Sequence, residues 1–381
     1  VLSLEAARRA ALGAGAKIVC SFAHKLSDGE LQAIEAGGCD IFILAGGTDG
    51  GDEETILHNA RRLASSNLSV PVIVAGNKVA SDRSCDILRE KGKMVLLTEN
   101  ILPALETLNT DPLHGVIRDV FMSHIIHAKG IDRAQKFVSG GIIPTPTAVL
   151  KGAQLLAEGT EGETGMGELV LVDVGGATTD VHSVSSGTAT KANVVKGLPE
   201  PYLKRTVEGD LGLRVNAATL LGRAGGELIR GYALALAPQL ETGVEEFANR
   251  VAADTSYVPT AGDELALDAA FSRAAVDLAM ERHAGTLNEV YTSIGPVQVQ
   301  YGKDLTAVRA IIGVGGVFAH GKYPRAVLEG AVFSSRRPLS LRPKEPRCYV
   351  DKNYILYGVG LLHDVDPAKA LRIGKKGLQP I

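Results

Sequence analysis

Aromatic residues are scarce in this sequence. It contains no tryptophan, nine tyrosines and eight phenylalanines among 381 residues, although apolar residues make up 45%. We therefore expect cores built mainly from aliphatic side chains. An excess of positive charge is also missing, because the formal net charge is −3. A protein that binds nucleic acid through a general basic surface needs the opposite balance, so we expect no nucleic-acid partner.

Cysteine clusters and long apolar runs are absent as well. The four cysteines form no C-x-x-C pair, and the nine histidines are scattered. Neither a zinc site nor a disulfide framework is indicated, and buried reduced thiols in a cytoplasmic protein are the simpler interpretation. No run reaches the roughly 18 apolar residues that cross a membrane, and no signal peptide opens the chain. The chain starts with Val1 rather than methionine, which is consistent with a fragment whose natural N-terminus is absent.

The length suggests two or three domains, and residues 1–110 have the pattern of one of them. Short apolar runs alternate there with helical stretches. We expect strands at residues 16–22, 40–45, 70–75 and 94–97, and helices that begin near Asp28 and at 53–63, 81–91 and 100–108. Such alternation predicts a parallel sheet between two helical layers, a small flavodoxin-like α/β domain.

The turn AGGTDGGDEE, Ala45–Glu54, is the most distinctive loop of this domain. It follows the second expected strand, at the end where open α/β sheets place their ligands. Its four carboxylates would repel a phosphate, and acidic residues are normal in the first turn of a helix. We favour a structural role for this loop and leave open a contact with a partner protein or a metal.

The remainder of the chain, residues 111–381, mixes helices with glycine-bearing strands. We expect a helix at 111–137, a second helix that begins near Thr147, a flexible loop at 159–167, and helices over most of 218–285. Residues 197–217 are typical of an exposed functional loop, in which Glu208, Asp210 and Arg214 are either functional or simply salt-bridged. A short strand near 354–356 and a terminal helix close the chain.

One stretch within this region points to chemistry. Leu169–Val174 is an apolar run that contains a carboxylate, Asp173, and it leads through Gly175 and Gly176 into a second strand-like run, which predicts a hairpin. Glycines leave backbone N–H groups open to phosphate oxygens, and the hydroxyls of Thr178 and Thr179 add donors. The string DVGGATTD therefore indicates a nucleotide-phosphate site beside a carboxylate that directs Mg²⁺. The alternative is a tight turn that the aspartate merely caps.

A second glycine-bearing turn follows later in the chain. Residues 308–312 are strand-like, and Gly313, Gly315 and Gly316 come directly after them. These glycines would let a ligand approach the backbone closely. A plain strand-to-helix turn remains the alternative.

Several motifs together resemble one known family. The strings PTPTAV (144–149), LVLVDVGGATTDVHSV, KRTVEGDLGLR and IIGVGGVFAHG, with AGGTDGG before them and YGVGLL after them, are similar to the glutamate mutase accessory proteins of MutL/GlmL type, which are unrelated to the mismatch-repair protein of similar name. The resemblance implies that residues 111–381 form an actin-like ATPase (ribonuclease H-like) domain. It implies ATP and Mg²⁺ as cofactors, and a B12-dependent mutase subunit as partner of an ATP-dependent chaperone or reactivating factor.

The resemblance also assigns the site residues. Asp173 would be the catalytic and metal-directing carboxylate, and the nucleotide would contact Gly175, Gly176, Thr178, Thr179, Gly313, Gly315 and Gly316. The first phosphate motif of that superfamily, D-x-G-S/T, is not found in 1–110. It either lies upstream in the natural protein or was never present, and in the second case the protein would be a scaffold independent of nucleotide.

Other functions fit the same scaffold. One is a small-molecule kinase or hydantoinase-like enzyme, because fold alone does not determine activity. Another is a nucleotide-independent module that binds a partner protein. A homo-oligomer is left open in each case.

Overall fold

The computed structural model describes residues 2–14, 16, 18–129, 143–190, 194–260, 262–293 and 295–381. Contacts divide the chain into unit 1, which is residues 1–142 with 197–199, and unit 2, which is residues 143–196 with 200–381. The sequence predicts a boundary at 110/111, whereas the contacts of the following helix, α5 (Asp111–Lys129), lie within unit 1. No helix in the described ranges is long and apolar enough to cross a membrane.

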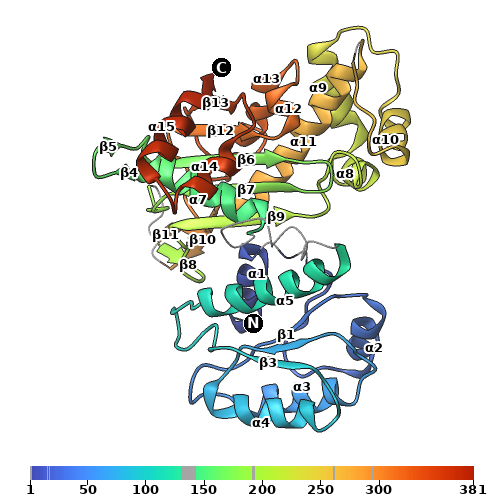
Figure 1. Cartoon of the computed structure of the whole chain (residues 1–381), viewed down its shortest axis with the longest axis vertical. Helices are drawn as coiled ribbons and strands as arrows, with labels where there is room; N and C mark the ends of the chain where they lie inside the picture. Colours follow the sequence, from blue (N-terminus) through green and yellow to red (C-terminus); the bar gives the residue numbers. More distant parts are fainter. Residues whose placement is uncertain are drawn as a thin grey trace. The chain divides into compact units, whose positions relative to one another are not determined.

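Unit 1 is the α/β domain that the alternation predicts (Figure 1). Its three parallel strands, in the order β1-β2-β3, are Phe42–Leu44, Val72–Val74 and Val95–Leu97. The helices that accompany α5 are α1 (Leu2–Gly13), α2 (Asp28–Ala36), α3 (Glu54–Ala64) and α4 (Lys78–Arg89). A capping box in which Ser27 and Glu30 satisfy each other's backbone N–H group starts α2.

Both faces of the small sheet are covered, as a three-layer arrangement requires. Val72 and Val74 of β2 pack with α3 and α4 on one face, and Ile73 packs with α1 and α5 on the other. Period-two alternation within a fully buried strand produces this division.

Two elements predicted for unit 1 do not form. The expected strand at 16–22 has no strand structure in its described residues, and Cys20 and Phe22 instead pack their side chains against the core. The expected helix at 100–108 is irregular, because Pro103 interrupts it and the Asn100 side chain accepts the N–H of Leu102 at 3.0 Å.

The loop at 45–54 is fastened to its surroundings by its own polar groups. Asp49 Oδ1 accepts the N–H of Lys78 at 3.0 Å and the amide of Asn100 at 2.8 Å. Asn77 Oδ1 accepts the N–H of Gly50 at 3.0 Å. These bonds support the structural role that the sequence favours.

Unit 2 is built on a six-stranded mixed sheet, in the order β14-β13-β12-β6-β7-β9 (Figure 1). β13, β12 and β6 are parallel, and β7 runs antiparallel to both β6 and β9. The strands are β6 (Leu169–Val174), β7 (Thr179–Val184), β9 (Leu203–Glu208), β12 (Ala310–Val314), β13 (Arg347–Asp351) and β14 (Leu378–Pro380).

Helices cover both faces of this sheet. One face packs with α7 (Thr145–Glu158), α14 (Leu356–Leu362) and α15 (Pro367–Gly377). The other packs with α8 (Ala217–Ala224), α9 (Gly226–Leu236), α10 (Val244–Ala253), α11 (Glu264–His283), α12 (Gly316–Ala319), α13 (Pro324–Leu328) and the short helix η1 (Glu329–Ala331).

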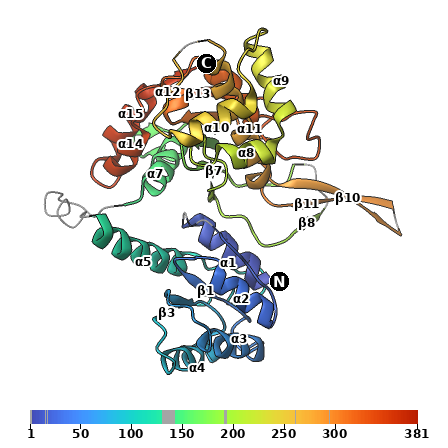
Figure 2. The ribbon, with the colours of Figure 1, turned by 90° about the vertical axis from the view of Figure 1, so that its right-hand side faces the viewer.

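The remaining strands of unit 2 form two small sheets. β4 (Gly159–Thr160) and β5 (Glu163–Thr164) form a hairpin. β10 (Thr286–Thr292), β11 (Gly295–Tyr301) and β8 (Val194–Lys196) form a sheet that extends away from the helices of unit 2 (Figure 2).

Three predictions for unit 2 were wrong in detail. Residues 203–208, predicted as part of an exposed loop, form β9, because pairing with β7 outweighs their charged composition. The predicted loop at 159–167 contains the β4–β5 hairpin. The predicted strand at 354–356 does not form: residues 354 and 355 are irregular, α14 begins at Leu356, and the strand lies earlier, as β13. The predicted helix at 111–137 is confirmed to Lys129, and residues 130–142 lie outside the described part.

Candidate functional site

The two glycine-bearing turns meet at one edge of the six-stranded sheet. β6 and β12 are parallel neighbours, and their last paired residues are Asp173 and Val314. Gly175 follows the first strand and Gly315 follows the second. Because parallel strands end at the same edge, segments that are distant in the chain lie side by side there. We call it the carboxyl edge; its residues are Asp173, Asp180, Asp351 and Gly315.

Gly315 is where the two turns are closest. Its φ of 106° is a backbone conformation that side-chain-bearing residues rarely adopt. A Cβ at this position would lie 2.5 Å from the carbonyl oxygen of Val174 and 3.2 Å from Oδ1 of Asp173. A side chain here would therefore separate β12 from the carboxylate.

Two further carboxyl groups lie beside Asp173, and the sequence analysis did not select them. Asp180 is the cross-strand partner of Asp173 in the β6–β7 hairpin, so both side chains lie on one face of the sheet. Asp351 ends β13, the neighbour of β12. The pattern that pointed to Asp173 also occurs at Asp351, because LVLVD and CYVD are both apolar runs that end in an aspartate.

Burial raises the pKa of all three carboxyl groups, and repulsion by a neighbouring carboxylate adds to the rise for Asp173 and Asp180. The pKa of Asp173 rises to about 6, chiefly because burial removes water and also because Asp351 is near. The pKa of Asp180 rises to about 7, again through burial first and Asp173 second, although the Thr178 hydroxyl and Arg205 oppose the rise. Clustered carboxyl groups with raised pKa values are typical of functional sites, and a cation would favour their ionised forms.

Asp351 also connects the carboxyl edge to a helix. The N–H of Leu356, the first residue of α14, donates to Asp351 Oδ2 at 2.7 Å. α14 in turn lies against α7 so closely that a Cβ at Gly360 would be 1.7 Å from the carbonyl oxygen of Ala148. A displacement of Asp351 would therefore be felt by both helices.

Two of the four residues predicted to contact phosphate in the β6–β7 turn, Gly175 and Gly176, lie on its accessible side. Gly176 is exposed and Gly175 is half-buried. The carbonyl of Gly176 accepts the N–H groups of Arg214 and Val215 at 2.9 and 3.0 Å, which fixes the turn in place. Thr178, which is half-buried, hydrogen-bonds Asp180.

Thr179 lies elsewhere. Its side chain is fully buried, and its hydroxyl donates to the carbonyl of Leu211 at 2.8 Å. The structure therefore does not bring this hydroxyl to the carboxyl edge.

The other two glycines of the second turn differ from Gly315. Gly313 is buried, and a Cβ there would lie 2.5 Å from the Phe318 ring, so this glycine serves packing. Gly316 is exposed, starts α12, and has open space around it.

Beside Asp180, a group of buried polar side chains continues along the same face. His182 faces Arg205 across β7 and β9, and Arg205 Nη1 donates to Thr147 Oγ1 of α7 at 3.4 Å. Both side chains are 5% exposed or less. Asp180 Oδ1, both ring nitrogens of His182 and Arg205 Nε have no hydrogen-bond partner among the described residues. Unpaired buried polar groups lower stability, so their presence beside Asp173 suggests a functional constraint.

The charged residues after β9 are used in ion pairs. Arg282 of α11 pairs with Glu208 and donates to Asp210 at 2.7 and 2.9 Å. Arg214 pairs with Asp268 at 2.8 Å. Of the two interpretations that the sequence left open, these contacts favour the salt-bridged one.

The carboxyl edge fits Mg²⁺ bound together with a phosphate ligand. No group of three or more His, Cys, Asp or Glu side chains is placed to hold a metal within the described ranges. Mg²⁺ keeps several of its waters and commonly uses one or two carboxylates together with substrate phosphates, so Asp173 and Asp180 suffice on the protein side.

Comparison with known proteins agrees with the motifs. Residues 1–378 match the profile of a family described as MutL protein. The chain is also similar to "Protein MutL" of Clostridium tetanomorphum, with 44% identity over 378 residues, which are 99% of this chain and 81% of that protein. Both matches run through unit 1 and unit 2 alike. The chain therefore belongs to the MutL protein family.

Proposed function

We propose that unit 2 binds Mg-ATP at the carboxyl edge, and that the protein is an ATP-dependent reactivating factor for a coenzyme-B12-dependent aminomutase such as glutamate mutase. The observation that carries the proposal is the pairing of Asp173 with the Gly315 turn. A carboxylate that directs a metal and a turn without side chains are the two parts that a nucleotide-phosphate site requires. Membership of the MutL family supports the accessory role.

Each residue of the edge has a distinct part in this proposal. Asp173 would hold the cation and position a water for attack on the phosphate, and Asp180 offers a second carboxylate on the same face of the sheet. Gly175 and Gly176 would let phosphate oxygens approach the backbone, and Gly315, which has no side chain, would hold the second turn close to Asp173. Mg²⁺, when bound, neutralises phosphate charge, which phosphoryl transfer needs most. Without the cation, three carboxyl groups would repel ATP, so binding should depend strictly on Mg²⁺.

A change at the phosphate can reach the helices through Asp351. This carboxylate holds the start of α14, and α14 lies against α7. A shift of Asp351 between nucleotide states would move this helix pair, which is how an ATPase converts hydrolysis into movement of a partner.

The test measures ATP hydrolysis with and without the B12-dependent mutase. We expect turnover that the mutase stimulates and that Asp173→Asn lowers by about a hundredfold or more. Asp364→Asn is the matched control, because this aspartate is exposed and pairs with Lys151 beyond the far end of α14. Gly315→Ala should abolish nucleotide binding, whereas Gly316→Ala, which has open space, should retain it.

The outcomes separate the alternatives. Turnover that only a small metabolite stimulates would indicate a kinase or hydantoinase-like enzyme. Binding of the mutase without any effect of Mg-ATP would indicate a nucleotide-independent module. The same assays on a chain that includes upstream residues would show whether a first phosphate motif completes the site.

A further inference from the structure

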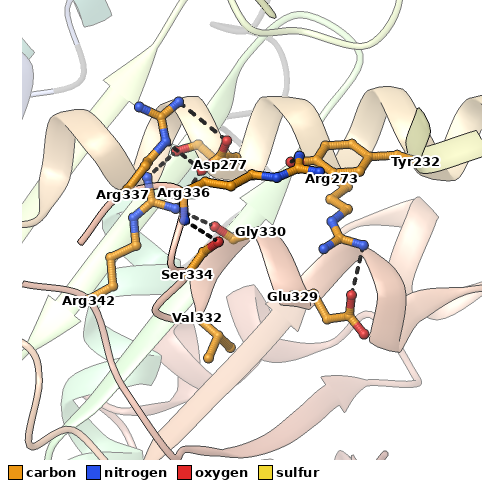
Figure 3. Close-up of a pocket in the computed structure, with 10 residues that line it drawn as sticks. All are labelled: Tyr232, Arg273, Asp277, Glu329, Gly330, Val332, Ser334, Arg336, Arg337 and Arg342. Atoms are coloured by element: carbon orange, nitrogen blue, oxygen red, sulfur yellow. Dashed lines mark hydrogen bonds and ion pairs between the residues drawn. The ribbon is translucent and has the colours of Figure 1, made fainter. Parts of the chain in front are cut away.

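A polar cavity lies in unit 2, between α9, α11 and the segment 329–342 (Figure 3). That segment leads from η1 back to the start of β13, where Arg347 pairs with Ala310 at the start of β12. The lining segment therefore leads to the end of these strands that is opposite to Asp173. It has a volume of about 140 Å³.

The cavity carries an excess of positive charge. Four guanidinium groups and two carboxylates line it, which are those of Arg273, Arg336, Arg337, Arg342, Asp277 and Glu329. One more carboxylate, Glu281, pairs with Arg337 from outside the lining. A formal excess of one positive charge remains after this pairing, so an anionic ligand is favoured.

Three of the arginines are held in place by carboxylates. Arg342 is 1% exposed and donates to Asp277 Oδ1 at 2.6 Å and to two backbone carbonyls at 2.8 Å. Arg337 also bonds Asp277, and Arg273 bonds Glu329 at 2.7 Å; these contacts are the dashed lines of Figure 3. This wall is rigid and prearranged, which lowers the cost of binding.

Two sets of N–H donors at the cavity, those of Arg336 and the Nε of Arg273, form no bond with a carboxylate of the described residues. Arg336 is exposed and forms no ion pair with any described residue; its Nη1 contacts the hydroxyl of Tyr232 at 3.5 Å. Arg273 Nε is buried and has no hydrogen-bond partner in the described part of the chain. The guanidinium carbons of Arg273 and Arg336 lie over the Tyr232 ring, at 4.2 and 5.5 Å from its centroid. Stacking thus holds two cations at the cavity, and the donors of Arg336 have no carboxylate partner within the described ranges.

We propose that this cavity binds a small free oxyanion of the phosphate or carboxylate class, with Arg336 as its main contact. Guanidinium groups match such anions with paired hydrogen bonds. A cavity of about 140 Å³ is comparable to one that holds a benzene-sized molecule, which suits an inorganic phosphate or an acetate better than a whole nucleotide. The site is independent of ATP binding at the carboxyl edge.

Isothermal titration of the full chain tests the proposal. The probes are inorganic phosphate and acetate, and a chloride titration at equal ionic strength is the reference. The anion that binds more tightly shows whether the ligand belongs to the phosphate or the carboxylate class. We expect saturable binding that Arg336→Gln weakens about tenfold or more, since a hydrogen bond from a charged group is lost. Arg230→Gln is the matched control, because Arg230 is exposed on the same helix as Tyr232 and lies outside the cavity lining.

Three results would overturn the proposal. They are the absence of binding by either anion, equal binding by Arg336→Gln and the unchanged protein, and loss of anion binding in Asp173→Asn, which would move the site to the carboxyl edge. Circular dichroism of each variant verifies folding. Because Asp173→Asn should leave this site intact, failure of the ATP proposal and failure of the anion proposal are distinguishable.

Discussion

Replacing Asp180 with asparagine should make the protein more stable, and increasingly so as the pH rises. The pKa of this carboxyl group is raised above its ordinary value by burial and by Asp173. The folded state therefore binds a proton more tightly than the unfolded state does. Its favourable contribution is fully present below the unfolded pKa of 3.8 and is lost as the pH rises through about 7. Asparagine stays neutral at every pH and keeps that contribution.

The size of the effect follows from the same values. A pKa raised from 3.8 to about 7 corresponds to ~4 kcal/mol of unfavourable ionisation in the folded state. Asp180 is only 4% exposed, so water screens little of this energy. Because the asparagine amide is itself a buried polar group without a full set of partners, we expect ~2 kcal/mol of net stabilisation at about pH 8, and almost none at about pH 4.

Urea unfolding over this pH range measures the difference. Far-UV circular dichroism follows the transition, and the Asp364→Asn variant controls for loss of an exposed carboxylate. Titration of other groups changes the free energy of unfolding of both proteins alike, so it cancels to first order in the difference between the variant and the unchanged protein. A variant that is less stable at high pH, or a difference that does not grow with pH, would refute the reasoning.

Two matched pairs of substitutions test the rest of unit 2. His182 and His283 are both fully buried, but only His283 is hydrogen-bonded through both ring nitrogens. Replacement of His283 by leucine should cost ~2 kcal/mol by leaving two hydroxyls unpaired, whereas His182→Leu should cost less than ~1 kcal/mol near neutral pH. Burial lowers the pKa of His182 to about 3, so its contribution is present above the unfolded pKa and lost as the pH falls, and the leucine variant should lose that acid sensitivity in urea titrations. Gly360→Ala should lower stability by several kcal/mol, on the order of 3, because its Cβ would overlap α7, whereas Gly358→Ala on the same helix meets nothing and should stabilise slightly in thermal unfolding.

The sequence predicted the elements whose signals are local. The β6–β7 hairpin follows from an apolar run, two glycines and a second strand-like run, and it forms with Asp173 opposite Asp180. Strands β1 to β3 and helices α2 to α4 form close to where alternation and capping place them. The described residues of 16–22 form no strand, because a short apolar run becomes a strand only if a neighbouring strand pairs with it. β9 was missed for the converse reason: its pairing with β7 makes a strand of a charged segment.

The family resemblance implied that Asp173 and Gly315 share a site, but the tertiary structure decided which other residues join them. An aspartate that ends a strand is visible in the sequence, but the order of strands in a sheet is set by how helices pack on both faces. That order brings Asp173, Gly315 and Asp351 from three separate segments to one edge. The raised pKa values, the overlap of α7 with α14 and the arginine cavity behind η1 follow from burial and contact across the fold. Residue types and their local spacing do not specify burial or contacts between distant segments, so these features could not be predicted from the sequence.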